Sequence, residues 1–164
     1  MRYAVFGGSF DPPHLGHVQV VRDLCQEYDE VLVCAASSNW TKASPFLPLE
    51  DRRALLGRAL VEEDRAVVDD YDYAYTIDLV QHLTQTLGPD TQIDLVIGDD
   101  LVGQMDRWRG IDELRKRCTI KVVPRGALSS TLVREAFNRK DLDYVRQICP
   151  QNVYEYLDSI KDLY

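Results

Sequence analysis

Two histidines in a glycine-rich segment are the residues of this sequence with the clearest potential for chemistry. The segment runs from Gly7 to His17 and reads Gly-Gly-Ser-Phe-Asp-Pro-Pro-His-Leu-Gly-His. Glycines let the backbone approach a phosphate closely, and a helix that begins in such a segment points free N–H groups at an anion. His14 and His17 are three residues apart, so they share one side of the first helical turn. We therefore expect a phosphate-binding loop whose two imidazoles donate hydrogen bonds to phosphate oxygens.

Familiar nucleotide and metal motifs do not describe this segment. It is neither the Gly-x-Gly-x-x-Gly dinucleotide fingerprint nor a Walker loop, because the Gly-Lys-Ser/Thr ending is missing. A metal pair is the main alternative for the histidines, but the sequence offers no third ligand nearby and their spacing differs from His-Glu-x-x-His. A purely structural role, a glycine turn with two histidines that cap the helix, would explain the glycines or the histidines alone. It does not explain why both occur together in one segment. We therefore expect phosphate chemistry and no protein-held metal.

A second cluster of donors, Ser129 to Arg134, reads Ser-Ser-Thr-Leu-Val-Arg and follows the last predicted strand. Its hydroxyls, its helix N–H groups and its guanidinium can hold phosphate oxygens. A lone Ser-Ser-Thr is usually only a helix N-cap, so this cluster gains weight through its pairing with the first one.

Short apolar runs alternate with segments of helical period along the chain. The predicted strands cover residues 3–6, 30–36, 65–68, 92–97 and 118–123. A first helix, with Asp11 as its N-cap, is expected to reach residue 28, and further helices cover 50–61, 75–87, 111–117, 129–137 and the segment around 153–163. The alternation predicts an α/β fold, a Rossmann-like parallel sheet with helices on both faces in a single domain. Ligands of such sheets bind beyond the carboxyl ends of the strands, where both clusters fall.

Composition narrows the class of protein further. The chain has 164 residues, which suits one domain over residues 1–164, and 27 acidic against 19 basic residues, for a net charge of −8. A chain with this excess of negative charge is a poor general binder of nucleic acid, because neutralisation of phosphates supplies most of that affinity. A polyphosphate ligand therefore needs a locally organised site. No apolar run is long enough to span a bilayer, and we expect a cytoplasmic protein without a membrane anchor. The cysteines lack metal-site spacing, and we assign them no chemistry. Assembly into a homo-oligomer stays open.

The two clusters resemble the two signature motifs of the nucleotidyltransferase superfamily that contains a His-x-Gly-His motif. Within it, the chain is most similar to the nicotinate (or nicotinamide) mononucleotide adenylyltransferase family. Tyr75-Thr76 resembles the family segment beside the nicotinate ring, and Ile97-Gly98-Asp99-Asp100 resembles its Ile-Gly-x-Asp. Trp108 falls where the family carries a tryptophan that stacks on the pyridine ring.

The resemblance implies an enzyme that joins ATP and a pyridine mononucleotide into a dinucleotide and releases pyrophosphate, with Mg²⁺ carried by the ATP. The catalytic residues it implies are His14, His17, Lys42 and Arg134. For ATP it implies Gly7, Gly8, Ser9, Phe10, Gly16, Gly98, Asp100, Ser129, Ser130 and Thr131. For the mononucleotide it implies Tyr75, Thr76 and Trp108.

The chain also departs from the family pattern. Asn39-Trp40-Thr41-Lys42 stands where the family usually has Pro-His-Lys, and Leu79 replaces a family threonine. The segment between residues 65 and 75 is shortened, which leaves the choice between the acid and the amide substrate open. Two alternative functions remain. One is a phosphopantetheine or other small-phosphate adenylyltransferase, and the other is a non-catalytic dinucleotide sensor.

Overall fold

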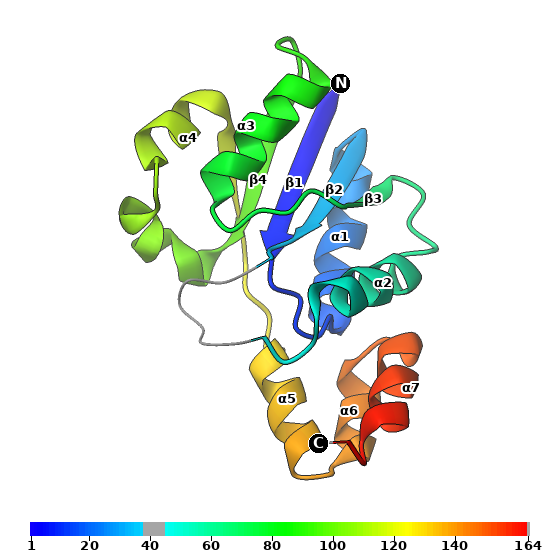
Figure 1. Ribbon diagram of the computed structural model, residues 1–164. Coiled ribbons are helices and arrows are strands. Elements are labelled where there is room, and N and C mark those ends of the chain that lie inside the picture. The colour runs from blue at the N-terminus through cyan, green and yellow to red at the C-terminus, as the bar shows by residue number, and fades with distance from the viewer. Residues whose placement is uncertain (38–44, 164) are drawn as a thin grey trace.

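The computed structural model describes residues 1–37 and 45–163, and these residues form one parallel sheet covered by helices (Figure 1). The five strands of the sheet are β1 (Arg2–Gly8), β2 (Glu30–Ala35), β3 (Ala66–Asp69), β4 (Gln92–Gly98) and β5 (Thr119–Val123). The helices are α1 (Leu15–Glu27), α2 (Leu49–Ala59), α3 (Thr76–Leu87), the 3-10 helix η1 (Asp99–Arg107), α4 (Ile111–Arg117), α5 (Ser130–Asn138), α6 (Leu142–Ile148) and α7 (Gln151–Ile160). No helix in the described part of the chain has the length and apolarity needed to cross a membrane.

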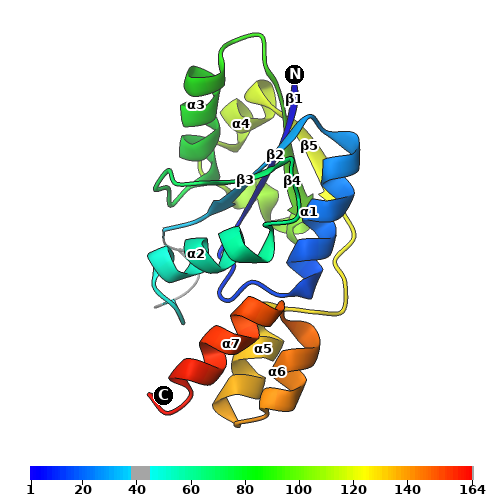
Figure 2. The same ribbon diagram turned by 90° about the vertical axis from the view of Figure 1, so that its right-hand side faces the viewer.

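Alternation of apolar side chains along the strands divides the core between the two faces of the sheet. One face carries Val5, Leu32 and Leu95, which pack with apolar residues of α3, α4 and η1. The other face carries Ala4 and Val33, which pack with α1 and α2. Figure 2 shows α3 and α4 on one side of the sheet and α1 on the other. The nearly continuous apolar runs of the strands reflect this double cover.

The strand order β3-β2-β1-β4-β5 determines where a ligand can bind. All neighbouring strands are parallel, and the order reverses direction between β1 and β4, whose residues Phe6 and Val96 are paired. At such a switch point the connections leave in opposite directions and open a crevice at the carboxyl ends of the strands. The segment that follows β1 and the segment that follows β4 therefore face the same crevice.

A third apolar cluster joins the last three helices to the rest of the molecule. Val133, Val145 and Leu157, one from each of α5, α6 and α7, are fully buried there. Leu47 and Leu55 extend this cluster to the segment before α2 and to α2 itself. The helices lie below the carboxyl ends of the strands in Figure 1, and α5 is thereby positioned against the crevice.

Two local predictions were wrong. The N-cap of α1 is His14 rather than Asp11, whose carboxylate instead accepts hydrogen bonds from two backbone N–H groups further along the chain. Helix α6 was not predicted, because its seven residues give only two buried positions, Val145 and Ile148, and Asp141 as an N-cap. In both places contacts with residues far away in the sequence, and not the local sequence pattern, determine the structure.

Candidate active site

A cavity of about 470 Å³ lies at the switch point between β1 and β4. Every residue predicted for the site that the structure describes lines this cavity. Those residues are Gly7, Gly8, Ser9, Phe10, His14, Gly16, His17, Tyr75, Thr76, Gly98, Asp100, Trp108, Ser129, Ser130, Thr131 and Arg134. Lys42, with the rest of the Asn39-Trp40-Thr41-Lys42 departure, lies outside the described residues. The roles of the individual residues stay predictions, but their convergence on one cavity is a property of the fold.

The hydrogen bonds of the two histidines determine which ring nitrogen carries the proton. Nδ1 of His14 accepts a hydrogen bond from the backbone N–H of Gly16 at 3.0 Å, and Nδ1 of His17 accepts one from the backbone N–H of His14 at 3.1 Å. A nitrogen that accepts cannot carry a proton, so a neutral ring must be protonated at Nε2. The rings stack with centroids 3.7 Å apart. The loop thus presents two Nε2–H donors side by side.

Burial keeps both imidazoles neutral. Burial of the ring, together with the nearby positive charge of Arg125 as a smaller cause, lowers the pKa of His14 from 6.5 to about 4. Burial also lowers the pKa of His17 well below its ordinary value, with a contribution from His14. Near pH 7 the pair therefore presents two oriented N–H dipoles to the cavity rather than two positive charges, which would repel each other at this separation.

Two glycines of the loop are required by close contacts. A Cβ on Gly16 would lie 2.8 Å from Cε1 and 2.9 Å from Nδ1 of the His14 ring. A Cβ on Gly7 would lie 2.9 Å from the hydroxyl of Tyr73, which donates a hydrogen bond to the backbone oxygen of Cys34 at 2.6 Å. Both positions leave no room for a side chain beside groups that are already fixed.

Helix α5 is bonded directly to the loop that carries the histidines. The hydroxyl of Ser130 donates to the backbone oxygen of Pro12 at 2.8 Å, and Nη1 of Arg134 donates to the backbone oxygen of Asp11 at 2.8 Å. Nη2 of Arg134 donates to the hydroxyl of Thr131 at 3.0 Å. The two motifs, more than a hundred residues apart in the sequence, therefore form one continuous wall of the cavity.

Two buried charged residues hold this wall in place: Asp11, which was predicted only as a helix cap, and Arg52, which was not predicted at all. The Asp11 carboxylate accepts hydrogen bonds from the backbone N–H groups of Phe46 at 2.6 Å and Leu47 at 2.8 Å. The Arg52 guanidinium donates to the backbone oxygens of Ser9 at 2.7 Å, Ala36 at 3.0 Å and Leu47 at 3.1 Å. Both side chains are almost fully buried. These hydrogen bonds connect the loop that carries the histidines to the start of α2 and thereby fix the shape of the loop.

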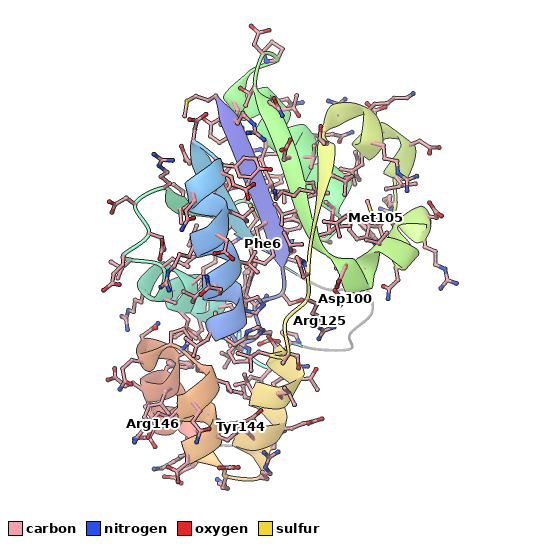
Figure 3. All side chains as sticks on the ribbon, turned by 180° about the vertical axis from the view of Figure 1, so that it is seen from behind. Phe6, Asp100, Met105, Arg125, Tyr144 and Arg146 are labelled. Carbon is pink, nitrogen blue, oxygen red and sulfur yellow. The ribbon has the colours of Figure 1, made fainter. Side chains whose placement is uncertain are left out.

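On the β4 side of the cavity, Asp100 is paired with Arg125. Nη1 of Arg125 lies 2.7 Å from Oδ2 of Asp100, and the two side chains lie next to each other in Figure 3. A Cβ on Gly98 would lie 2.5 Å from Oδ1 of Asp100, so this glycine admits the carboxylate. Arg125 was not predicted as a site residue. Its signal was its place just beyond β5, at the same edge of the sheet as the other cavity residues.

Flat side chains line the part of the cavity beside α3. Tyr75 is the N-cap of α3, and Trp108, which ends η1, is half-buried and packs against the core. Arg109 also lines the cavity, and its guanidinium carbon lies 3.8 Å from the centroid of the Tyr75 ring. This region can hold a planar aromatic group between apolar surfaces.

The cavity is positively charged in an acidic protein. Among the described residues that line it, Arg109, Arg125 and Arg134 carry positive charge and Asp100 alone carries a negative one. The whole chain has a net charge of −8. Positive charge is thus concentrated in this cavity, and such a concentration favours the binding of an anion.

Comparison with known proteins agrees with this geometry. A model of the cytidylyltransferase-like family matches residues 5–152. A relative from Shouchella clausii that carries the name nicotinate-nucleotide adenylyltransferase is 37% identical over 137 residues, which cover 79% of this chain and 71% of the relative. A relative of the same name from Chlorobaculum tepidum is 35% identical over 143 residues, with coverage of 79% and 71%.

Solved structures share the fold over nearly the whole chain. The nicotinic acid mononucleotide adenylyltransferase of Plasmodium falciparum, complexed with NaAD, superimposes with a TM-score of 0.82 at 16% identity and covers 99% of this chain and 98% of its own. A Vibrio parahaemolyticus nicotinate-nucleotide adenylyltransferase structure gives a TM-score of 0.80 at 23% identity, with coverage of 95% and 97%. These structures confirm the predicted Rossmann-like fold.

The chain therefore belongs to the cytidylyltransferase-like family of nucleotidyltransferases, within the group of nicotinate-nucleotide adenylyltransferases.

Proposed function

We propose that this chain, as one nucleotidyltransferase domain over residues 1–164, transfers the adenylyl group of ATP to nicotinate or nicotinamide mononucleotide. A phosphate oxygen of the mononucleotide attacks the α-phosphorus of ATP and forms a new P–O bond. The bond from that phosphorus to the oxygen of the β-phosphate breaks, and pyrophosphate leaves with the electron pair. The attacking oxygen is already ionised near pH 7, so the reaction needs no general base. The protein must position the reactants and stabilise the charge of the transition state.

The observation that carries this proposal is the convergence of the two Nε2–H donors and Arg134 on one cavity. His17 and the loop N–H groups are assigned to the α-phosphate, and His14 to a neighbouring phosphate oxygen. Lys42, which the family resemblance implies as a catalytic residue, is assigned to another phosphate oxygen as a prediction. Preorganised donors of this kind stabilise the charge that builds on a transferring phosphoryl group without reorganising during the reaction.

Arg134 is assigned to the leaving pyrophosphate. Its guanidinium has further N–H donors beyond the two bonds that hold it to the loop and to Thr131. Ser130, which the family resemblance places among the ATP-binding residues, already donates its proton to the backbone oxygen of Pro12. We therefore assign Ser130 the positioning of α5, which brings its N–H groups and Arg134 to the phosphates.

The divalent cation expected for an ATP-dependent nucleotidyltransferase is proposed to be Mg²⁺, and it reaches the site on the triphosphate. Within residues 1–37 and 45–163 no group of three or more His, Cys, Asp or Glu side chains is placed to hold a metal. Both imidazoles already use Nδ1 for backbone N–H groups. Phosphate oxygens and water are ligands that Mg²⁺ prefers, and the bound cation would neutralise charge on the departing pyrophosphate.

Pyrophosphate release from ATP tests the proposal when each acceptor is supplied separately. Release with a pyridine mononucleotide is the expected result. Release with phosphopantetheine alone, or binding of the dinucleotide without turnover, would instead support one of the two alternative functions. His17→Ala should lower kcat by about two to three orders of magnitude. The matched control is His82→Ala, since His82 stacks on Tyr71 away from the cavity and its loss should leave kcat unchanged.

A further inference from the structure

Arg109 is a charged residue of the cavity that neither phosphate motif explains. It lies in the short connection between η1 and α4, directly after Trp108, and lines the cavity. Its guanidinium carbon lies 3.8 Å from the centroid of the Tyr75 ring. At this separation the cation and the ring are in van der Waals contact, and the attraction between them restrains the long side chain.

The backbone on both sides of Arg109 is also held in place. Gly110 has a φ of +65°, and a Cβ at this position would lie 3.0 Å from Cγ1 of Ile77, in the first turn of α3. The N–H of Trp108 donates to the backbone oxygen of Met105 at 3.0 Å. Arg109 is therefore fixed beside the start of α3 rather than carried on a free loop.

The charge of Arg109 remains available to a ligand. In the wall of the cavity, Arg125 is paired with Asp100, and Arg134 donates to the backbone oxygen of Asp11. None of the ion pairs formed by the described residues includes Arg109. Stacking on Tyr75 occupies one flat face of the guanidinium. The described residues form no ion pair with the N–H donors in its plane, and those donors suit a planar, bidentate acceptor.

We propose that Arg109 binds the ring carboxylate of nicotinate mononucleotide and thereby makes this enzyme select the acid over the amide. The inference rests on the proposed function. A pyridine ring stacked on Trp108 would place its substituent close to the next residue in the chain. A carboxylate offers two acceptor oxygens and a negative charge to the guanidinium, whereas a carboxamide is neutral and its NH₂ group faces another donor. The two substrates differ only in this group, so Arg109 would act on selectivity and not on the phosphate chemistry.

The test is the ratio of kcat/KM for nicotinate mononucleotide to kcat/KM for nicotinamide mononucleotide, measured for Arg109→Gln and the unaltered enzyme. The ratio should fall about tenfold, which corresponds to about 1.4 kcal/mol, through loss of activity with the acid. The kcat/KM of Arg109→Gln for nicotinamide mononucleotide should stay within about twofold of the value for the unaltered enzyme. Arg107→Gln is the matched control, because it removes the same charge two residues earlier at a position outside the cavity wall, and it should leave the ratio unchanged.

Two conservative variants separate recognition from a structural role. Arg109→Lys keeps the charge but loses the planar pair of donors, so it should retain only part of the acid preference. Tyr75→Phe keeps the ring under the guanidinium and should retain nearly all of it. An unchanged ratio in Arg109→Gln would overturn the inference. So would an equal loss with both substrates, which would indicate binding of the shared phosphate or disruption of the fold.

Failure of the proposed function can be distinguished from failure of this inference. If the unaltered protein formed no dinucleotide from either mononucleotide, the proposed function would be wrong whatever Arg109 does. Calorimetric titration of the unaltered protein and Arg109→Gln with each mononucleotide would then decide the inference by binding alone. Tighter binding of the acid that is lost in the variant would support it, and equal affinities for acid and amide in the unaltered protein would overturn it.

Discussion

Replacing Gly16 by alanine should separate catalysis from stability, because the added methyl group would meet the His14 ring. The new Cβ would lie 2.8 Å from Cε1 of that ring, whereas ordinary contacts begin at 3.4 Å. The ring must therefore move by about 0.6 Å or more. Its Nδ1 is bonded to the N–H of Gly16 itself, and its face is stacked on His17 at 3.7 Å. Movement of one imidazole thus disturbs both Nε2–H donors.

The expected magnitudes follow from these contacts. Misplacement of a catalytic group by about 1 Å can cost about a hundredfold in rate, so kcat should fall by about ten- to a hundredfold. Overpacking costs about 1–3 kcal/mol, and the better helix propensity of alanine offsets part of this cost in the first turn of α1. The free energy of unfolding should therefore fall by only about 1 kcal/mol, which leaves the variant folded.

Gly57→Ala provides the matched control. Gly57 lies within α2, and a Cβ there would meet nothing within 4 Å. Alanine should raise the free energy of unfolding by about 0.5–1 kcal/mol and leave kcat unchanged. Steady-state pyrophosphate release measures kcat, and urea unfolding measures stability. Normal kcat in Gly16→Ala would show that the placement of the His14 ring does not matter for catalysis.

Three further predictions follow from the site. Below about pH 6.5 the two histidines become protonated in the unfolded chain but stay neutral in the folded protein, where burial lowers their pKa. The free energy of unfolding should therefore fall as the pH drops from about 6.5 to about 4. Urea titrations should show a shallower fall in the double variant His14→Asn, His17→Asn, and equal slopes would contradict the assigned pKa shifts. Trp108→Ala should raise KM for the mononucleotide about five- to tenfold and leave KM for ATP unchanged. An unchanged KM for the mononucleotide would show that the pyridine ring does not stack on Trp108. Asp11→Ala leaves one buried and one partly buried N–H group without their acceptor and should lower the free energy of unfolding by about 2–4 kcal/mol, more than Asp11→Asn in the same assay.

The repetitive parts of the fold could be predicted from the sequence because local pattern determines them. Apolar runs and helical periods located all five strands and most helices to within a few residues. The order of the strands could not be read in this way, since pairing between β1 and β4 joins residues that are 90 positions apart in the sequence. Helix α6 escaped notice because its stability depends on burial of Val145 and Ile148 against the other C-terminal helices.

In the site, too, local sequence patterns predicted some residues, whereas residues placed by long-range contacts were not predicted. Motif spacing predicted the histidines, the Ser-Ser-Thr helix and Arg134 as residues of one site, because each belongs to a cluster with its own chemistry, and all of them line the cavity. It did not identify Arg109 or Arg125, since a single arginine in a connecting segment resembles any solvated arginine. It also assigned Asp11 to the wrong task, because the N–H groups that donate to its carboxylate lie more than thirty residues away and no local signal distinguishes a helix cap from a long-range contact. The arginines could have been suspected from their positions beside Trp108 and beyond the end of β5.

The most direct test of the account is a crystal structure of the protein with a non-hydrolysable ATP analogue and Mg²⁺. We expect the triphosphate in the cavity between β1 and β4, with Nε2 of His14 and His17 within hydrogen-bond distance of phosphate oxygens and the Arg134 guanidinium on the terminal phosphates. A triphosphate bound outside this cavity would contradict the account, and so would one that contacts neither imidazole.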